Sequence, residues 1–251
     1  FNNRVSVGAD FYLHKTDDLL TYQTFSTPIS GINQYWSNGG SLENKGFEVT
    51  VSGKPVSTRD LTLEIGASVG HYDNKITALP SRVFVDGVKA FNSTDYCNSV
   101  YGDNNILVAV DAPIGQFYGY ETAGVFATDA EAKSAGKDGY LYILDAAGNK
   151  QNFTAGDVHF VDQNGDGCID EHDKKVIGNP NPDFYGNIFA SLNWKRFTLD
   201  MGFNFSVGND VFNYQRSILN AGSNFYNQQV AEMNHWRYEG HQASLPKLAF
   251  G

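Results

Sequence analysis

Cysteine is scarce in this sequence, and long hydrophobic runs are missing from it altogether. The 251 residues include only two cysteines, Cys97 and Cys168, which lie in unlike contexts and without CxxC spacing. Neither a zinc site nor a disulfide framework is therefore indicated, although one disulfide between the two cysteines stays open. No run of about 18 consecutive apolar residues occurs, which excludes membrane-spanning helices.

Charge is also low and one-sided. Asp, Glu, Lys and Arg make up 18% of the residues, whereas about 25% is usual. The 28 acids outnumber the 18 bases, so the formal net charge is -10 and the pI is about 4.9. This balance argues against the basic surface that a nucleic-acid-binding protein needs, and we expect no nucleic acid among the partners.

Aromatic residues and glycine, by contrast, are plentiful. Phe, Tyr and Trp together make up 14% of the chain, and there are 26 glycines. A disordered chain would be poor in aromatics, a coiled coil would be rich in Glu, Lys and Leu, and a collagen would place Gly at every third position. The composition instead indicates an all-β protein.

Five stretches alternate apolar and polar residues with the period of two that is typical of strands with two different faces. They are 5–13, 47–53, 61–69, 188–194 and 197–207. The charged residues within them all fall on the polar parity: Asp10, Glu48, Glu64 and Asp200. Such strands fit either a soluble β-sandwich with a dry core or a transmembrane barrel with lipid outside and a polar lumen inside.

The connections between these stretches alternate in length. Residues 54–60 and 195–196 are short turns, whereas 14–46 and 70–187 are long connections, and 208–251 shows no further clear strand. Short turns at one rim and long loops at the other are typical of outer-membrane barrels, and compact soluble domains rarely have such long loops. Within 70–187, capping-box spacing from Thr128 to Glu131 predicts a short helix, and 140–153 predicts a small hairpin.

One motif carries specific chemistry. Residues 162–173 read DQNGDGCIDEHD and match the spacing of a twelve-residue calcium loop, with Gly167 at the position where the loop turns sharply. The predicted ligands are side-chain oxygens and one backbone carbonyl: Asp162, Asn164, Asp166, Cys168 (carbonyl), Asp170 and Asp173. Because no flanking amphipathic helices are found, we expect a structural Ca²⁺ that holds a loop. The alternative is an ordinary solvated turn, which is also rich in Asp, Asn and Gly.

Catalysis has little support. The sequence contains no GxSxG, HExxH or P-loop motif, and its six histidines show no zinc-ligand spacing. We therefore predict no catalytic residues and a protein that is not an enzyme. A glycoside hydrolase stays open as a third, weaker alternative, because acids are plentiful and sequence alone cannot pair them across a sugar.

Three motifs, in order and in spacing, resemble the SusC/RagA family of TonB-dependent outer-membrane transporters. They are GGSLENKGFEVTV (39–51), APIGQFYGYETAGVF (112–126) and GDVHFVDQNGDGCIDEHDKKVIGNPNPDFYGN (156–187). The similarity covers essentially the whole chain. It implies that 1–251 is a late portion of a large, 22-stranded antiparallel transmembrane β-barrel, with 70–187 as a long extracellular loop region that carries the calcium-type loop. Five strands alone cannot close a barrel in lipid, so the rest of the wall must come from elsewhere.

The resemblance also implies a function and partners. A SusC/RagA protein lies in the bacterial outer membrane and imports oligosaccharides or peptides. It works with a SusD-like surface lipoprotein, and the TonB complex energises it through parts that this sequence does not contain. The sequence identifies no substrate-binding residues. The alternative from another class is a soluble, calcium-stabilised β-sandwich that binds glycans.

Overall fold

A computed structural model of the chain describes residues 4–24, 34–79, 96–98, 106–137, 139–220 and 227–248. The chain divides into two compact units. The first, here called the sheet unit, comprises Phe1–Val100, Ile106–Gln116 and Gly178–Val211. The second, the loop unit, comprises Tyr101–Asn105, Phe117–Ile177 and Phe212–Gly251.

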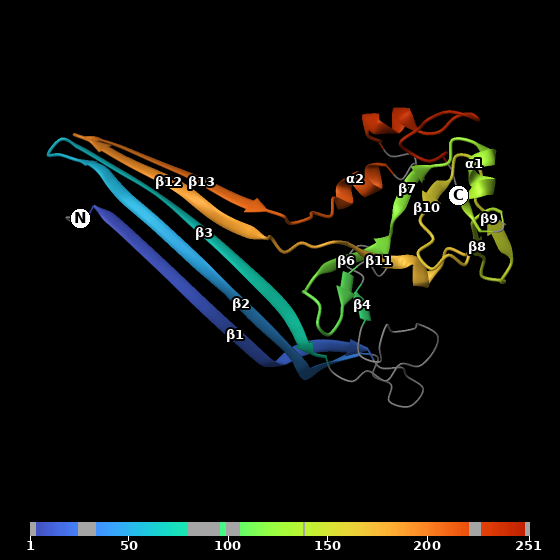
Figure 1. The fold of residues 1–251 in the computed structure, drawn as a ribbon, viewed down its shortest axis with the longest axis horizontal. Helices are drawn as coiled ribbons and strands as arrows, with labels where there is room; N and C mark the ends of the chain where they lie inside the picture. Colours follow the sequence, from blue (N-terminus) through green and yellow to red (C-terminus); the bar gives the residue numbers. More distant parts are fainter. Residues whose placement is uncertain are drawn as a thin grey trace. The chain divides into compact units, whose positions relative to one another are not determined.

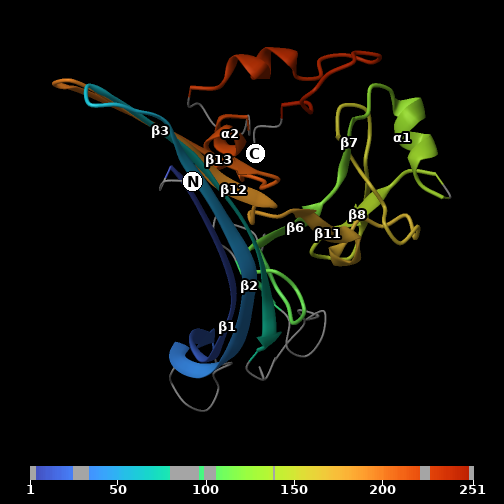
Figure 2. The same cartoon turned by 60° about the vertical axis from the view of Figure 1, so that its left-hand side comes forward.

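The sheet unit is built on five antiparallel strands that lie side by side in the order β1-β2-β3-β12-β13 (Figure 1; Figure 2). Their bounds are β1 Val5–Thr24, β2 Gln34–Ser57, β3 Leu61–Ala78, β12 Phe184–Trp194 and β13 Phe197–Val207. The same unit holds the short antiparallel pair β4 (Tyr96–Asn98) and β5 (Ile106–Val108). No helix among the described residues has both the length and the hydropathy that crossing a membrane requires.

The strands are longer than the alternating stretches of the sequence. The predicted connection 14–46 is largely strand, because β1 continues to Thr24 and β2 begins at Gln34. The predicted connection 70–187 is also shorter at both ends, since β3 continues to Ala78 and β12 begins at Phe184. In these extensions both faces of the strand carry polar residues, so the period-two contrast that predicts a strand disappears while the backbone pairing goes on.

The loop unit contains short strands and helices. Their bounds are β6 Gln116–Tyr120, β7 Thr122–Val125, α1 Asp129–Ala135, β8 Tyr142–Leu144, β9 Lys150–Asn152, β10 Val158–Phe160, η1 Glu171–Asp173, β11 Lys174–Gly178, α2 Tyr214–Leu219 and η2 Val230–Asn234. The predicted helix and hairpin are both confirmed. Thr128 and Glu131 form a complete capping box at α1, and β8 pairs with β9. The sequence did not predict α2 and η2.

The buried core of the loop unit gathers around α1. Phe126, Ala132, Leu141 and Ile169 form it, and partly buried aromatic rings pack against it. A segment near the C-terminus, 235–247, is hydrogen-bonded onto this core, and we call it the C-terminal strap. The Ala127 carbonyl accepts hydrogen bonds from Trp236 Nε1 at 3.1 Å and from the Gly240 N–H at 2.8 Å. Burial of apolar side chains and backbone pairing together hold this unit.

Candidate functional site

The strand register places the apolar residues of all five strands on one face of the sheet. One row across the sheet consists of Val7, Val51, Ala67, Ile188 and Phe203, each opposite the next. These large side chains are not a buried core, because Phe203 is 67% exposed and Phe11 is 81% exposed. A soluble sandwich would bury this face. The described residues therefore do not support the sandwich expectation.

The opposite face is polar across the same five strands. A neighbouring row consists of Gly8, Thr50, Ser68, Asn187 and Asn204. The Ser68 hydroxyl donates to Asn187 Oδ1 at 2.9 Å, and the Tyr185 hydroxyl donates to Glu48 Oε1. The predicted parity of the acids is confirmed, because Glu64 and Asp200 both stand opposite Ser191 on this face.

Two aromatic rings on the polar face cover glycines of the neighbouring strand. The Phe189 ring lies over Gly66 and the Tyr185 ring lies over Gly70, so a Cβ at either glycine would overlap the ring. Covering glycine with a cross-strand aromatic ring restores packing that the missing side chain would forfeit. Phe189 is thus an aromatic residue on the polar face for a structural reason.

The apolar face ends abruptly at both ends of the strands. At one end Trp194 and Phe197 stack with ring centroids 6.2 Å apart beside the turn at Lys195. The Lys195 N–H donates to the Asp60 carbonyl at 2.8 Å, so the two short turns lie together. Aromatic residues beside short turns are typical of the interfacial girdle of a membrane barrel.

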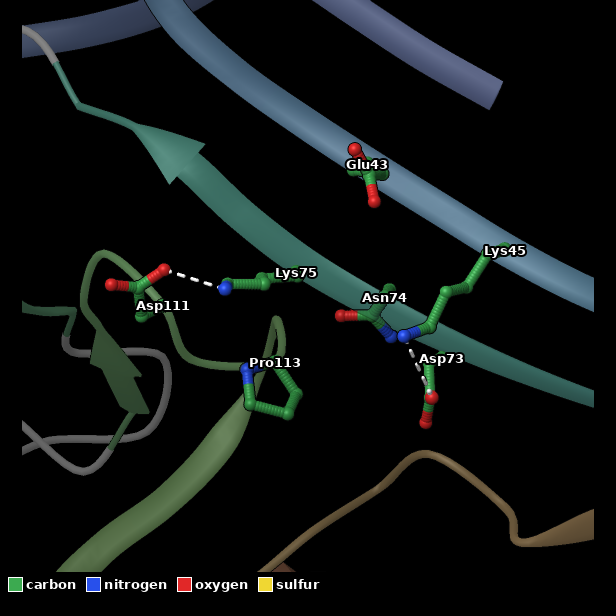
Figure 3. Close-up of a pocket in the computed structure, with 7 residues that line it drawn as sticks. All are labelled: Glu43, Lys45, Asp73, Asn74, Lys75, Asp111 and Pro113. Atoms are coloured by element: carbon green, nitrogen blue, oxygen red, sulfur yellow. Dashed lines mark ion pairs between the residues drawn. The ribbon is translucent and has the colours of Figure 1, made fainter. Parts of the chain in front are cut away.

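At the other end the same face becomes charged beyond the row of Phe11, Phe47 and His71. Glu43 stands opposite both Lys15 and Lys75 in register. Lys15 Nζ lies 3.2 Å from Glu43 Oε2, and Lys75 Nζ lies 2.7 Å from Asp111 Oδ1. We call this the charged ladder. Figure 3 shows that it borders a cleft of about 150 Å³, where Lys75 points to Asp111 and Lys45 points to Asp73.

Sequence reasoning missed the charged ladder. Its members continue the odd-numbered parity of Phe47 and His71, but they are charged and so did not count as part of an apolar face. The signal that could have found them is the switch from apolar to charged residues at unchanged parity.

The Asp-rich loop 162–173 lies in the loop unit and begins with a tight turn. Asp162 Oδ1 accepts a hydrogen bond from the Gly165 N–H at 2.6 Å, and its Oδ2 accepts from the Gly167 N–H at 2.8 Å. Asn164 Oδ1 accepts from the Asp166 N–H at 2.8 Å. Gly167 has a φ of 85°, a conformation that glycine adopts without strain. The turn predicted at Gly167 is therefore present.

The end of this loop is anchored by two buried residues. Asp173 is fully buried, and its two carboxylate oxygens accept from the Gln163 N–H at 2.9 Å and the Asp170 N–H at 2.8 Å. Ile169 belongs to the core of the loop unit, and its N–H donates to the Tyr142 carbonyl at 2.8 Å. Asp173 thus joins the two ends of the loop, a role that the sequence did not predict.

The six predicted ligands lie in this one loop, but the side-chain oxygens of its five Asp and Asn ligands accept hydrogen bonds from backbone N–H groups of the loop. Asp166 Oδ1 accepts from the Cys168 N–H at 2.7 Å, and Asp170 Oδ1 accepts from the His172 N–H. Within the described residues, no group of three or more His, Cys, Asp or Glu side chains is placed to hold a metal ion. The donor types still suit a hard cation, since a carboxylate oxygen has a second lone pair. Calcium binding therefore stays a prediction.

The acids of the loop also affect their neighbours. Burial raises the pKa of Tyr120 to about 12, and the nearby carboxylates of Glu171, Asp170 and Asp173 add to this shift. Burial raises the pKa of the Cys168 thiol, and the nearby carboxylates of Asp170, Asp166 and Asp173 raise it further. Cys168 is a free, buried thiol, so its side chain is poorly reactive, while the side chain of Cys97 lies outside the described residues.

Comparison with known proteins gives consistent results. No protein-family profile matches the chain. The chain is 30% identical over 252 residues to TonB-dependent receptor P3 of Formosa agariphila, covering 99% of this chain and 23% of that receptor. It is 26% identical over 212 residues to TonB-dependent receptor SusC of Bacteroides thetaiotaomicron, covering 84% of this chain and 18% of SusC.

Solved structures show the same fold. The RagAB peptide transporter matches with a TM-score of 0.62 and 24% identity, covering 99% of this chain and 24% of that chain. The RagAB peptide importer in its closed-closed state matches with a TM-score of 0.65. The two-faced antiparallel sheet is thus part of a TonB-dependent transporter fold, and the predicted fold class is confirmed.

More particularly, the relatives named TonB-dependent receptor and SusC, together with the RagAB structures, are consistent with a fragment of the SusC/RagA family, as the three sequence motifs predict. The chain spans about a fifth of the length of the curated relatives that it matches, 23% of receptor P3 and 18% of SusC. The relatives are named as receptors and transporters rather than enzymes, in line with the lack of catalytic motifs.

Proposed function

We propose that the chain forms part of the wall and outer loops of an active transporter in the bacterial outer membrane. The transporter imports oligosaccharides or peptides, works with a SusD-like lipoprotein and is energised by TonB. One observation carries the location in a membrane: apolar and polar faces that stay in register across five strands, with the apolar face exposed. In a barrel wall the apolar face contacts lipid and the polar face lines the lumen.

The height of the apolar face supports this proposal. The face runs along β3 from Leu61 to His71, eleven residues whose ten steps extend roughly 33 Å along the strand. Strands in outer-membrane barrels tilt by about 40°, which converts this length to about 25 Å across the membrane, the height of the apolar band of such barrels. The stacked Trp194 and Phe197 and the charged ladder then lie at the two headgroup layers.

The proposed partners and substrates are based on the resemblance to the SusC/RagA family. The similar solved structures are of RagAB, a peptide transporter. By analogy, a surface lipoprotein covers the lumen of this transporter on the side of the long connections. Peptides and oligosaccharides are both candidate substrates, because the transporter fold and the two faces of the sheet favour neither class.

Nitroxide probes on the two faces of β13 test the location. In the full-length receptor, with Cys97→Ser and Cys168→Ser, Phe203→Cys or Asn204→Cys supplies one attachment point at a time. We expect the probe at position 203 to collide with dissolved oxygen, which concentrates in lipid, and the probe at position 204 to collide with a water-soluble nickel complex. A probe at 203 that is shielded from both would instead indicate the core of a sandwich and would overturn the proposal.

We further propose that Ca²⁺ binds the loop 162–173 and has a structural role, as its spacing predicts. Binding at a hundredfold excess over the dissociation constant would stabilise the loop by about 2.7 kcal/mol. Adding EGTA to the full-length receptor should then speed both proteolysis and amide exchange within 162–173, and Ca²⁺ should reverse the effect. Asp166→Asn keeps the oxygen that accepts from the Cys168 N–H but removes the charge, so it should abolish the dependence on Ca²⁺.

The matched control for this experiment is Asp145→Asn, in the exposed turn between β8 and β9, where Asp145 accepts from the Ala147 and Asn149 N–H groups. This variant should keep the full response to Ca²⁺. If EGTA leaves exchange of 162–173 unchanged in the native receptor, the loop is held by its own hydrogen bonds and the calcium proposal fails.

A further inference from the structure

The loop unit has a cavity of about 350 Å³ between α1, the β8–β9 hairpin and the Asp-rich loop. These elements are neighbours in both ribbon views (Figure 1; Figure 2). The side chains that define its chemistry are cationic, aromatic and acidic: Lys133, Lys137, Lys150, Tyr140, Tyr142 and Asp166. The volume lies at the lower end of the range of small-molecule sites, which is enough for one or two sugar rings.

The cavity is cationic in a chain whose net charge is -10. Three lysines line it, and among its lining residues Asp166 is the single carboxylate. Within the described residues, none of the three lysines forms an ion pair, unlike the lysines of the charged ladder. Asp166 is partly neutralised by its own loop, since it accepts hydrogen bonds from the Cys168 N–H and from Asn164 Nδ2. Ammonium groups gathered without carboxylate partners attract an anion.

The walls of the cavity are held in place by the fold. Lys150 Nζ lies 4.0 Å from the centre of the Tyr142 ring, and Tyr142 stands opposite Asn152 in the β8–β9 register. The Tyr140 hydroxyl donates to Asp129 Oδ2 at 2.8 Å. The cavity therefore presents two fixed tyrosine rings, the Asn152 amide and three ammonium groups. Rings offer an apolar surface, while the amide and ammonium groups offer hydrogen bonds and charge.

We infer that this cavity binds an acidic saccharide, one that carries a uronate carboxylate or a sulfate ester. The inference rests on the proposed transport function and deepens it by naming a class of substrate that the outer loops capture. A saccharide is favoured over an acidic peptide because flat aromatic surface and an amide accompany the charge. The lysines hold the anion, and the tyrosines and Asn152 contact the ring that carries it.

Lysine footprinting of the full-length receptor in detergent tests this inference. The rate of acetylation of each lysine is measured by mass spectrometry with and without four probes of similar size: tetragalacturonate, a chondroitin sulfate disaccharide, neutral maltotetraose and tetraglutamate. We expect one or both acidic saccharides to protect Lys133, Lys137 and Lys150, and not Lys45 of the sheet unit. Lys133→Gln combined with Lys150→Gln should weaken binding at least tenfold by calorimetry, and Lys45→Gln should leave it unchanged. Binding should weaken as salt is raised.

Each of the other outcomes would overturn the inference. Equal protection by maltotetraose would show that charge is irrelevant, equal protection by tetraglutamate would show that the site does not select saccharides, and no protection by any probe would show that the cavity does not bind. Which of the two acidic saccharides protects the lysines shows whether the cavity binds a carboxylate or a sulfate ester. The nitroxide experiment on β13 is independent of this test. If the probe at position 203 contacts lipid but no saccharide protects the lysines, the inference about the cavity fails while the proposed membrane location stands.

Discussion

In the proposed transporter, replacing Phe203 by arginine should impair assembly of the barrel wall severalfold. Phe203 lies on the exposed apolar face, in the fourth of the six rows that run from Leu61 to His71, and so near the middle of the apolar band. An arginine at the midplane of the lipid face of a barrel costs about 2–4 kcal/mol. We expect Phe203→Arg to lower the amount of heat-modifiable, folded receptor in the outer membrane severalfold, as read from the shift between folded and unfolded bands on a gel.

The matched control is one residue along the same strand. Asn204→Arg places the same side chain on the polar face, opposite Asn187, which faces the lumen in the proposed barrel. Folded receptor should then stay close to the wild-type level. Equal loss in both variants would mean that β13 is sensitive to any arginine, and equal tolerance would mean that Phe203 does not face lipid. Either result contradicts the assignment of the two faces.

Replacing Asp173 by alanine should release the Asp-rich loop. The fully buried carboxylate accepts from two backbone N–H groups at 2.9 and 2.8 Å, and alanine would leave both donors unpaired. Hydrogen bonds to charged groups contribute about 1.5–3 kcal/mol each, so the two together predict a loss of about 3–6 kcal/mol in the stability of the loop. Amide exchange at Gln163 and Asp170 should speed by at least a hundredfold.

Two further variants separate this role from general surface effects. Asp173→Asn keeps one acceptor oxygen and should give an intermediate rate of exchange, whereas Glu171→Gln changes an exposed neighbour in η1 and should have little effect. If Asp173→Ala exchanges no faster than Glu171→Gln, the buried carboxylate does not hold the ends of the loop together. Amide exchange is measured in the presence of EGTA, because Asp173 is also a predicted Ca²⁺ ligand and this comparison concerns only its hydrogen bonds.

Sequence alone predicted the two faces of the sheet well, because alternation is a local property that the pleat of a strand enforces. Glu64 and Asp200 fall on the polar face for that reason. It also predicted α1, since a capping box needs only Thr128 and Glu131 at a fixed spacing. The ends of β1, β2 and β3 could not be predicted in the same way, because there backbone pairing continues without a contrast between faces.

The candidate sites show a similar division. The predicted metal ligands lie in one loop because they are close together in sequence. The backbone N–H groups to which their oxygens hydrogen-bond, however, depend on the folded conformation of the loop, which the sequence pattern does not specify. The cavity lysines were not predicted. Lys133 and Lys150 are seventeen positions apart, and only the tertiary fold of the loop unit brings α1 and the β8–β9 hairpin to the same cavity.

The C-terminal strap determines when the loop unit can finish folding. The Ala127 carbonyl receives the Trp236 indole N–H across a separation of 109 residues, and strands β12 and β13 lie between them in the sequence. Contacts of such separation form slowly, because a long loop must close before any contact stabilises it. A chain that is delivered from its N-terminus therefore has to supply strands β12 and β13 before the strap can complete the loop unit. In the proposed transporter, completion of the loop unit and closure of the barrel wall are in this way coupled in time.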